Sequence, residues 1–376
     1  MDMGIAGALA ASLATSALLS MLLNALPAAV LSRGRDDPRV VWFRARALAG
    51  FTLAVVVLAW LWLAFAFSAA ELAALSAPRM PTGARWEGGG WTERFALAAN
   101  LMRLWPQWDV RGAACGLGVV AVLFLGPLVD GVWEGVELYR ARSASAAGAG
   151  LRFHGPPDGR AEGADVNAAP DSSKPREAAT DWRLLGRCVL ASLSEMDDAV
   201  QCPPPHDRAR QLIIVRDLVA APLLEEALFR CAVGAVLLAA GASPTAAFWL
   251  DPIAFAGAHM HHGWRQFRDG APLASVAASV LFRSAYTFVF GLLAMHLWLA
   301  GPTPAGAVVA HMACNWLGPP DIARVIRSVN ASRLPGSAAA VCAARARAAV
   351  VVCAYLAGVV GFFLAAPRLT AWASAA

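Results

Sequence analysis

Long apolar stretches separated by short polar segments run through the whole chain. We expect eight of them to be helices that cross a membrane. They cover residues 4–31, 47–70, 112–132, 211–240, 243–260, 271–300, 303–318 and 340–366. A helix needs about 20 mostly apolar residues to cross the hydrocarbon core, so 243–260 and 303–318 are short for this role. Such segments can still lie at membrane depth where protein or a water-filled cavity covers them.

The composition agrees with this pattern. Of the 376 residues, 58% are hydrophobic and only 15% are charged, which is too apolar for an ordinary soluble domain. The prediction is an all-α, polytopic integral membrane protein of about eight transmembrane helices. The formal net charge of +5 resides mostly in loop arginines. These suit an anionic membrane surface better than nucleic acid, so we expect membrane lipids as partners and no nucleic acid.

Arginines also predict the orientation. With eight spans, four arginine clusters fall on one side of the membrane, which the positive-inside rule makes cytosolic. Both termini are then lumenal. The long loop 71–111 also holds arginines but is acidic as well. The four clusters are Arg33 to Arg46, Arg140 with Arg142, Arg265 with Arg268, and Arg324 to Arg347.

Changes in composition divide the chain into five parts. Residues 143–181, rich in Ala, Gly, Pro, Ser and Asp, are predicted to be a flexible cytosolic linker. The seven cysteines are scattered without a CxxC pair, which indicates apolar helix residues rather than disulfides or a zinc site. The parts are 1–142 with three transmembrane helices, the linker 143–181, a possible interfacial helix in 182–205, a catalytic core in 206–321, and a basic loop with the last helix in 322–376.

Ionisable residues in the predicted core stand out, because charged groups at membrane depth are costly and usually face a helix bundle or a water-filled cavity. In APLLEEALFR, Glu226 and Arg230 have the i, i+4 spacing of a helical ion pair. Glu225 lies about 100° around the helix and lacks that partner. We therefore expect Glu226 to be structural and Glu225 to be the more basic carboxylate.

Two further segments repeat this spacing. Phe255 and His259 lie four residues apart in FAGAH, and His311 and Asn315 do so in HMACN. If the three polar faces meet, a carboxylate, two imidazoles and a carboxamide surround one intramembrane cavity. That set suits hydrolysis of an amide bond, because a carboxylate can take a proton from water and a histidine with an asparagine can donate to the oxyanion. There is no HExxH motif of the thermolysin type.

Other polar residues have simpler interpretations. His262 shares the helical face of His259 and can support it, whereas His261 points toward the cytosolic rim. A lone histidine in a helix, such as His296, more often makes a hydrogen bond between helices than it catalyses a reaction. The pair of Glu226 and Arg230 can also serve packing alone.

The three motifs together resemble those of the CAAX prenyl protease type 2 family, the Ras-converting endopeptidases of the endoplasmic reticulum. This family lies within the CPBP (Abi) intramembrane proteases, whose pattern is EExxxR, FxxxH and HxxxN. The resemblance covers about residues 211–321 and includes the FRSAYTFVFGLLAMHLWLAG stretch. The chain has Arg216 and Asp217 where the family usually has Arg-Asn, and Ala256 where a Gly is usual.

The resemblance implies an endoplasmic reticulum enzyme that removes the last three residues of farnesylated or geranylgeranylated CAAX proteins, such as Ras-like small GTPases. By motif position, Glu225 and His259 would activate the water. His311 and Asn315 would form the oxyanion site, with Glu226, Arg230, Phe255 and His262 as supporting residues. The active site would open toward the cytosol.

Two alternatives stay open. In a zinc-dependent version of the same protease, Glu225, His259 and His311 would bind Zn²⁺ with one open position; Asn315 is a poor zinc ligand and a good oxyanion donor, so a site without cofactor is favoured. In the other alternative, the chain is a non-catalytic membrane scaffold or an ion carrier whose buried Glu, Arg and His residues line a path. Transporters commonly show internal repeats, and the sequence shows none.

Overall fold

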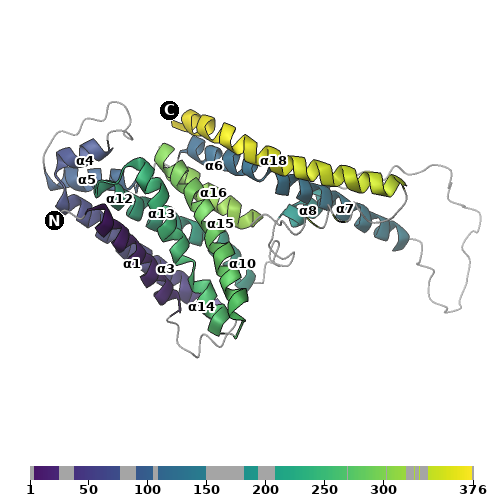
Figure 1. The fold of residues 1–376 in the computed structure, drawn as a ribbon, viewed down its shortest axis with the longest axis horizontal. Helices are drawn as coiled ribbons and strands as arrows, with labels where there is room; N and C mark the ends of the chain where they lie inside the picture. Colours follow the sequence, from purple (N-terminus) through teal and green to yellow (C-terminus); the bar gives the residue numbers. More distant parts are fainter. Residues whose placement is uncertain are drawn as a thin grey trace, which may run out of the picture.

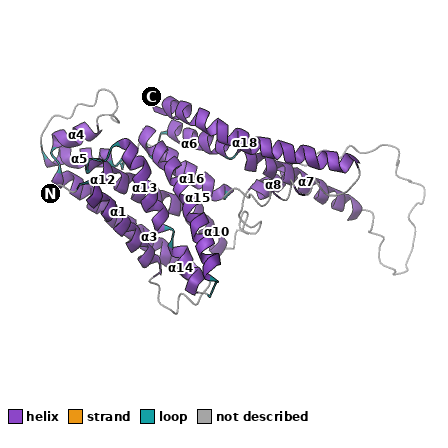
Figure 2. Ribbon diagram, viewed as in Figure 1, coloured by secondary structure: helices purple, strands orange, loops and turns teal. Residues whose placement is uncertain are grey.

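A computed structural model describes residues 4–24, 38–76, 90–104, 109–149, 182–193, 208–268, 270–301, 303–318, 326, 330 and 338–374. Within these ranges the regular structure is entirely helical, as Figures 1 and 2 show. The fold class is therefore all-α, as the sequence predicts. The six cysteines in the described ranges are free thiols.

Each predicted apolar segment contains at least one helix, but several helices extend beyond the predicted bounds and others lie between the segments. In the first half of the chain they are α1 (Ile5–Asn24), α3 (Pro38–Ala66), α4 (Ala69–Ser76), α5 (Trp91–Leu101), α6 (Val110–Leu123), α7 (Leu125–Ala149) and α8 (Trp182–Leu193). In the second half they are α10 (Arg208–Val215), η2 (Arg216–Ala220), α11 (Ala221–Glu226), η3 (Ala227–Gly234), α12 (Ala235–Ala239), α13 (Pro244–Ala258), α14 (His261–Arg268), α15 (Leu273–Ala300), α16 (Ala305–Leu317) and α18 (Ala338–Ser374).

Three of the described helices are long and apolar enough to cross a membrane: Arg39–Ala66, Leu273–Ala300 and Val341–Ser374. The pair Val110–Leu123 and Leu125–Ser143, bent by 74°, makes a fourth if it is one broken span. Shorter apolar helices lie at Ile5–Leu19 and Ala305–Leu317. The chain is thus a multi-pass membrane protein by its apolar helices, with three or four clear spans in its described part.

Two predicted segments differ from the structure in detail. The segment 211–240 was expected to be one uniform helix, but it contains two π-helical stretches, η2 and η3, on either side of α11. Pro222 offers a reason for the first, because it has no N–H for the carbonyl four residues earlier. The first residues of the predicted linker 143–181 are helical, since α7 continues to Ala149; residues 150–181 lie outside the described part.

The helices form a compact body and an arm (Figure 1). In the body, α1 and α15 pack on α13, and α3 packs on α5 and η3. The arm consists of α6, α7, α8 and α18, and α16 connects it to the body by packing against both α6 and α15. The α8 helix, predicted as interfacial, lies along α7. The body and arm thus meet at the helix that carries His311 and Asn315.

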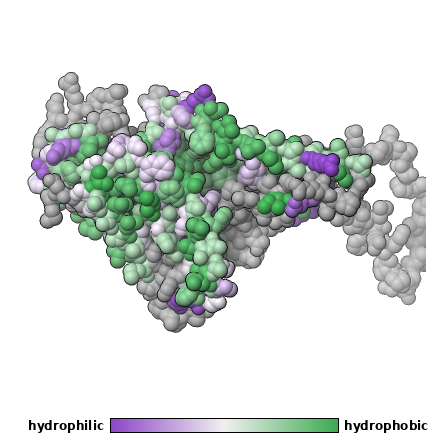
Figure 3. Space-filling view, viewed as in Figure 1, coloured by the Kyte–Doolittle hydropathy of each residue, from purple (hydrophilic) through white to green (hydrophobic). Residues whose placement is uncertain are grey.

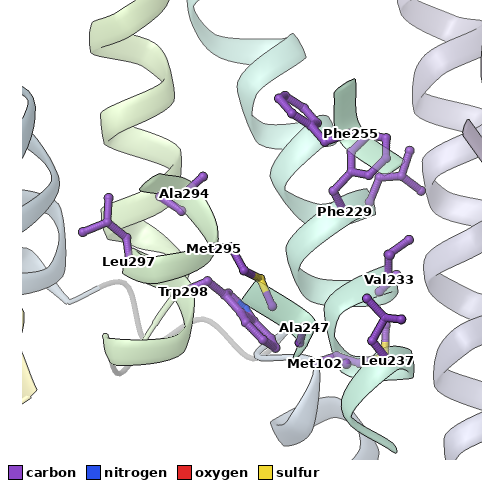
Figure 4. Packing of buried hydrophobic residues seen from close by; sticks show 14 of the residues in the cluster. Met102, Phe229, Val233, Leu237, Ala247, Phe255, Ala294, Met295, Leu297 and Trp298 are labelled. Atoms are coloured by element: carbon purple, nitrogen blue, oxygen red, sulfur yellow. The ribbon is translucent and has the colours of Figure 1, made fainter. Parts of the chain in front are cut away.

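Large apolar side chains fill the body and also cover its outside. Phe229 and Phe255 face one another above Met295 and Trp298, which are fully buried (Figure 4). Figure 3 shows apolar side chains gathered over much of the visible face of body and arm. Exposed examples include Leu281 on α15 and Phe363 on α18. Exposed leucine and phenylalanine on long apolar helices are expected where lipid, rather than water, surrounds the protein.

Small residues allow α6 and α16 to approach closely. A Cβ atom added to Gly116 would overlap the backbone carbonyl oxygen of Gly306, and one added to Gly306 would lie 2.9 Å from the oxygen of Gly112. Glycine pairs of this kind let membrane helices pack backbone to backbone. The position of α16 against α6 therefore requires glycine, which has no side chain, at these contacts.

We expect Gly116→Ala to lower the melting temperature of the detergent-solubilised protein, because the new methyl group must push two backbones apart at a cost of roughly 1–3 kcal/mol. Gly50→Ala is the matched control, since an added Cβ there meets nothing within 4 Å and alanine favours a helix over glycine. Equal melting temperatures for the two variants would contradict the close contact.

Candidate active site

The two adjacent glutamates at the end of α11 face different surroundings. The Glu226 side chain is fully buried, whereas that of Glu225 is 18% exposed. Neighbouring residues of a helix point about 100° apart, so one carboxylate can enter the core while the other reaches a surface. Each glutamate therefore has its own set of partners.

Glu226 belongs to a buried charge cluster formed with Arg230 and Asp251. The Arg230 Nε atom lies 3.2 Å from Glu226 Oε2 and 3.6 Å from Asp251 Oδ2, and all three side chains are 0% exposed. The guanidinium also donates to the carbonyl oxygen of Gly291 at 3.4 Å and lies 4.3 Å from the Phe255 ring centroid. The i, i+4 pair is thus present as predicted, with a second carboxylate beside it.

His311 connects the charge cluster to Glu225. Its Nδ1 atom lies 2.7 Å from Glu226 Oε1 and its Nε2 atom 3.8 Å from Glu225 Oε2. An ionised carboxylate only accepts hydrogen bonds, so Nδ1 carries the proton that is donated to Glu226. The neutral ring then presents a lone pair at Nε2, and a protonated ring presents an N–H there. The ring packs against Phe290, with centroids 4.6 Å apart.

His259 approaches Glu225 from the other side. It caps the C-terminus of α13, and its Nδ1 atom donates to the carbonyl oxygen of Phe255 at 2.9 Å. Its Nε2 atom lies 3.8 Å from Glu225 Oε2, and its side chain is 25% exposed. The Phe255 carbonyl oxygen keeps the proton of His259 on Nδ1, as Glu226 does for His311. Both imidazoles therefore turn Nε2 toward Glu225.

This arrangement can hold and activate a water molecule. Separations of 3.8 Å between Glu225 and each Nε2 atom are too long for direct hydrogen bonds but fit one water that bonds to two of the groups. A carboxylate within one water of the reacting atom meets the geometric requirement for a general base. The predicted meeting of the Glu225, His259 and His311 faces is present in the structure.

Asn315 lies one turn beyond His311 on α16. Its amide donates to the carbonyl oxygen of Asp217 at 2.9 Å, which joins α16 to η2. An amide nitrogen has two hydrogens, so a second remains for a substrate atom on the same side as His311. The side chain is exposed, as contact with a substrate requires.

The distances in this site differ from those of an ideal tetrahedral zinc site. Tetrahedral zinc at about 2.1 Å from each ligand would place ligand atoms roughly 3.4 Å apart, closer than the 3.8 Å between Glu225 and either histidine. Within the described part of the chain, no group of three His, Cys, Asp or Glu side chains could hold a metal ion.

One residue of the charge cluster was missed from the sequence. Asp251 is a single carboxylate in the apolar run FWLDPIAFAGAH, four residues before Phe255 and eight before His259. These positions share one helical face, and the high cost of a charge at membrane depth was a signal that could have identified it. The side chains of His261 and His262, the latter predicted as supporting, lie outside the described residues.

Comparison with known proteins finds similarity in the segment that carries these residues. Residues 209–317 match the model of the family described as type II CAAX prenyl endopeptidase Rce1-like. The chain is 37% identical over 105 residues to CAAX prenyl protease 2 of Caenorhabditis elegans, covering 28% of this chain and 39% of that protein. It is 33% identical over 110 residues to the human CAAX prenyl protease 2, covering 29% and 33%. No solved structure matches.

The matches leave most of each protein uncompared. A third relative, the probable CAAX prenyl protease 2 of Schizosaccharomyces pombe, is 32% identical over 121 residues, which is 32% of this chain and 44% of the relative. The chain therefore spans less than half the length of the relatives that it matches. The matched residues nevertheless include Glu225, His259, His311 and Asn315 together. In this segment, the chain is similar to the Rce1-like type II CAAX prenyl endopeptidases.

Proposed function

We propose that this protein is an intramembrane endopeptidase that removes the C-terminal tripeptide from prenylated CAAX proteins. The observation that carries the proposal is the convergence of His259 Nε2 and His311 Nε2 on Glu225, at 3.8 Å each, within the segment that matches the family. Its relatives of known name are CAAX prenyl proteases. Ras-like small GTPases with prenylated tails are substrates of this class.

The geometry supports a hydrolytic mechanism without a cofactor. Glu225 and His259 hold a water molecule, and Glu225 takes its proton as the oxygen attacks the scissile carbonyl. Asn315 and the protonated His311 donate to the resulting oxyanion. His311 can carry that charge because Glu226 accepts its Nδ1 hydrogen at 2.7 Å. When the C–N bond breaks, Glu225 returns the proton to the leaving amine, which restores the starting state.

The prenyl group explains why such a site would lie in a membrane. At about 0.8 kcal/mol per buried CH₂, a 15-carbon farnesyl chain contributes a large binding free energy. A cavity that opens to lipid lets this chain enter without leaving the bilayer. We propose the eight-span topology for the same reason: it places the site within the endoplasmic reticulum membrane and opens it to the cytosol, where CAAX tails are found.

The reconstituted protein should release a tripeptide from a farnesylated CAAX peptide and leave the unprenylated peptide of the same sequence intact, as read by mass spectrometry. The lipid contributes most of the binding free energy, so its removal should abolish detectable cleavage at micromolar peptide. Absence of cleavage together with proton or ion flux in the same vesicles would favour a carrier instead.

The same cleavage should persist after exhaustive chelation, because Glu225 and its two histidines are spaced for a water rather than for zinc. Metal analysis of the purified, active protein provides the control. Loss of activity on chelation, with recovery on adding Zn²⁺, would instead establish the zinc-dependent version.

The two glutamates should fail in different ways. Glu225→Gln keeps the shape of the side chain but removes the base, so turnover should fall at least about 10²-fold while the melting temperature stays near that of the parent. Glu226→Gln removes the negative charge shared by His311 and Arg230 and replaces one of the two acceptor oxygens with an NH₂ group, so it should lower both turnover and melting temperature. A stable, inactive Glu226→Gln beside a fully active Glu225→Gln would reverse the assignment.

Within the charge cluster, Arg230→Met should be more destabilising than Glu226→Gln. Asp251 remains 3.6 Å from Arg230 when Glu226 is neutralised, so the cation keeps a counter-ion. Loss of Arg230 leaves Asp251 buried without its cation and Glu226 with His311 alone, and breaking a buried pair typically costs about 3–5 kcal/mol. Thermal unfolding in detergent measures the order of the two variants, and the reverse order would exclude Asp251 as a counter-ion.

A further inference from the structure

Arg216 and Asp217 form a two-pronged ion pair on η2, before the first glutamate of the site. The Arg216 Nε atom lies 2.6 Å from Asp217 Oδ1, and Nη2 lies 2.7 Å from Oδ2. The two side chains are 13% and 34% exposed, respectively. A guanidinium is therefore held in the orientation that binds a carboxylate, close to the surface.

The contact between Arg216 and Asp217 is local. Its partners are neighbours in the chain and lie in the same turn of one helix, so the pair joins no separate elements. Partly exposed ion pairs also contribute little to stability, typically 0–1 kcal/mol. By contrast, the other strong contact of this turn, from Asn315 to the Asp217 carbonyl oxygen, joins η2 to α16.

The pair belongs to the turn that contacts α16 next to the reactive groups. On α16, His311 is beside Glu225 and Asn315 is beside Asp217, so η2 and α11 run antiparallel to α16. Asp217 precedes Glu225 by eight residues, which corresponds to at most about 12 Å, because Asp217 to Ala220 lie in the π-helical stretch η2 and rise less per residue than an α-helix. Arg216 precedes Asp217 in the chain, so it lies farther from Glu225 along the helix than the Asp217 carbonyl oxygen that Asn315 contacts.

We infer that Arg216 binds the free C-terminal carboxylate of the substrate; this inference rests on the proposed function. The three residues to be released, when extended, span about 10 Å from the scissile carbonyl to the terminal carboxylate. That length is similar to the separation of Asp217 and Glu225 along the helix. The planar guanidinium binds a carboxylate through two parallel hydrogen bonds, which a lysine cannot do.

Asp217 gives the site its selectivity. In the free protein it occupies the guanidinium, so an incoming group must compete with it. A carboxylate can do so because it replaces both hydrogen bonds and the charge, whereas a neutral carboxamide replaces neither in full. Asp217 is about one-third exposed, so water can solvate it when it is displaced.

The test measures binding, with turnover removed by Glu225→Gln. A fluorescent farnesylated CAAX peptide is prepared with a free C-terminal carboxylate and as its carboxamide, and fluorescence anisotropy gives both dissociation constants. We expect the acid to bind about 10- to 100-fold more tightly. Adding Arg216→Gln should remove this preference by weakening the acid alone, and Asp217→Asn should tighten the acid several-fold without changing the amide.

Two further variants complete the set. Arg216→Lys keeps the charge and should retain an intermediate preference. Arg368→Gln is the control, because that exposed arginine on α18 donates to the Leu364 carbonyl oxygen and should leave both constants unchanged.

Equal affinity for acid and amide, binding of neither peptide, or equal weakening of both by Arg216→Gln would overturn the carboxylate site; the last result would show a structural role. Failure of the proposed function has a different signature, since the protein with Glu225 intact would then leave the acid peptide uncleaved. A preference for the acid that depends on Arg216 would still establish the binding site in that case.

Discussion

The buried cation of Arg230 is the constraint on which the rest of the site depends. A guanidinium with no exposed surface is tolerated only where opposite charge and hydrogen-bond acceptors surround it. Glu226, Asp251 and the carbonyl oxygen of Gly291 supply these from α11, α13 and α15. Because Arg230 lies on η3, the one cation holds four elements in a fixed relation. The positions of the neighbouring Glu225 and His259 follow from that relation.

The cluster also explains why two adjacent glutamates occur in an apolar segment. Glu226 divides its oxygens between Arg230 and His311, so the buried carboxylate both balances the cation and sets the tautomer of the imidazole. Glu225, one residue earlier, is excluded from this network by the helical rotation and reaches the partly exposed space between two histidines. One carboxylate is held by fixed partners, and the other is left to accept a proton.

Spacing along a single helix was enough to predict the Glu226–Arg230 pair and the polar faces of His259 and His311. It could not predict that Glu226 bonds His311, because the two residues lie 85 positions apart and spacing on one helix does not determine how another is rotated against it. The 74° bend after Leu123 had a local signal in Pro127, which has no N–H to bond the Leu123 carbonyl. Asp251 also had a local signal, a lone carboxylate in an apolar segment, but its partner Arg230 lies on another helix.

The parts of the chain outside the family segment have a structural connection to the site. Gly306, where α16 meets α6, and His311 are five residues apart, which places them about 140° apart around the helix. The face of α16 toward the arm is therefore roughly opposite the face toward α11. Close packing of glycines determines how far α16 can move on one side, and hydrogen bonds from His311 and Asn315 determine its rotation on the other. An oxyanion donor must be placed to within a fraction of an ångström. By packing against the opposite face of α16, the apolar arm therefore helps to fix the positions of His311 and Asn315.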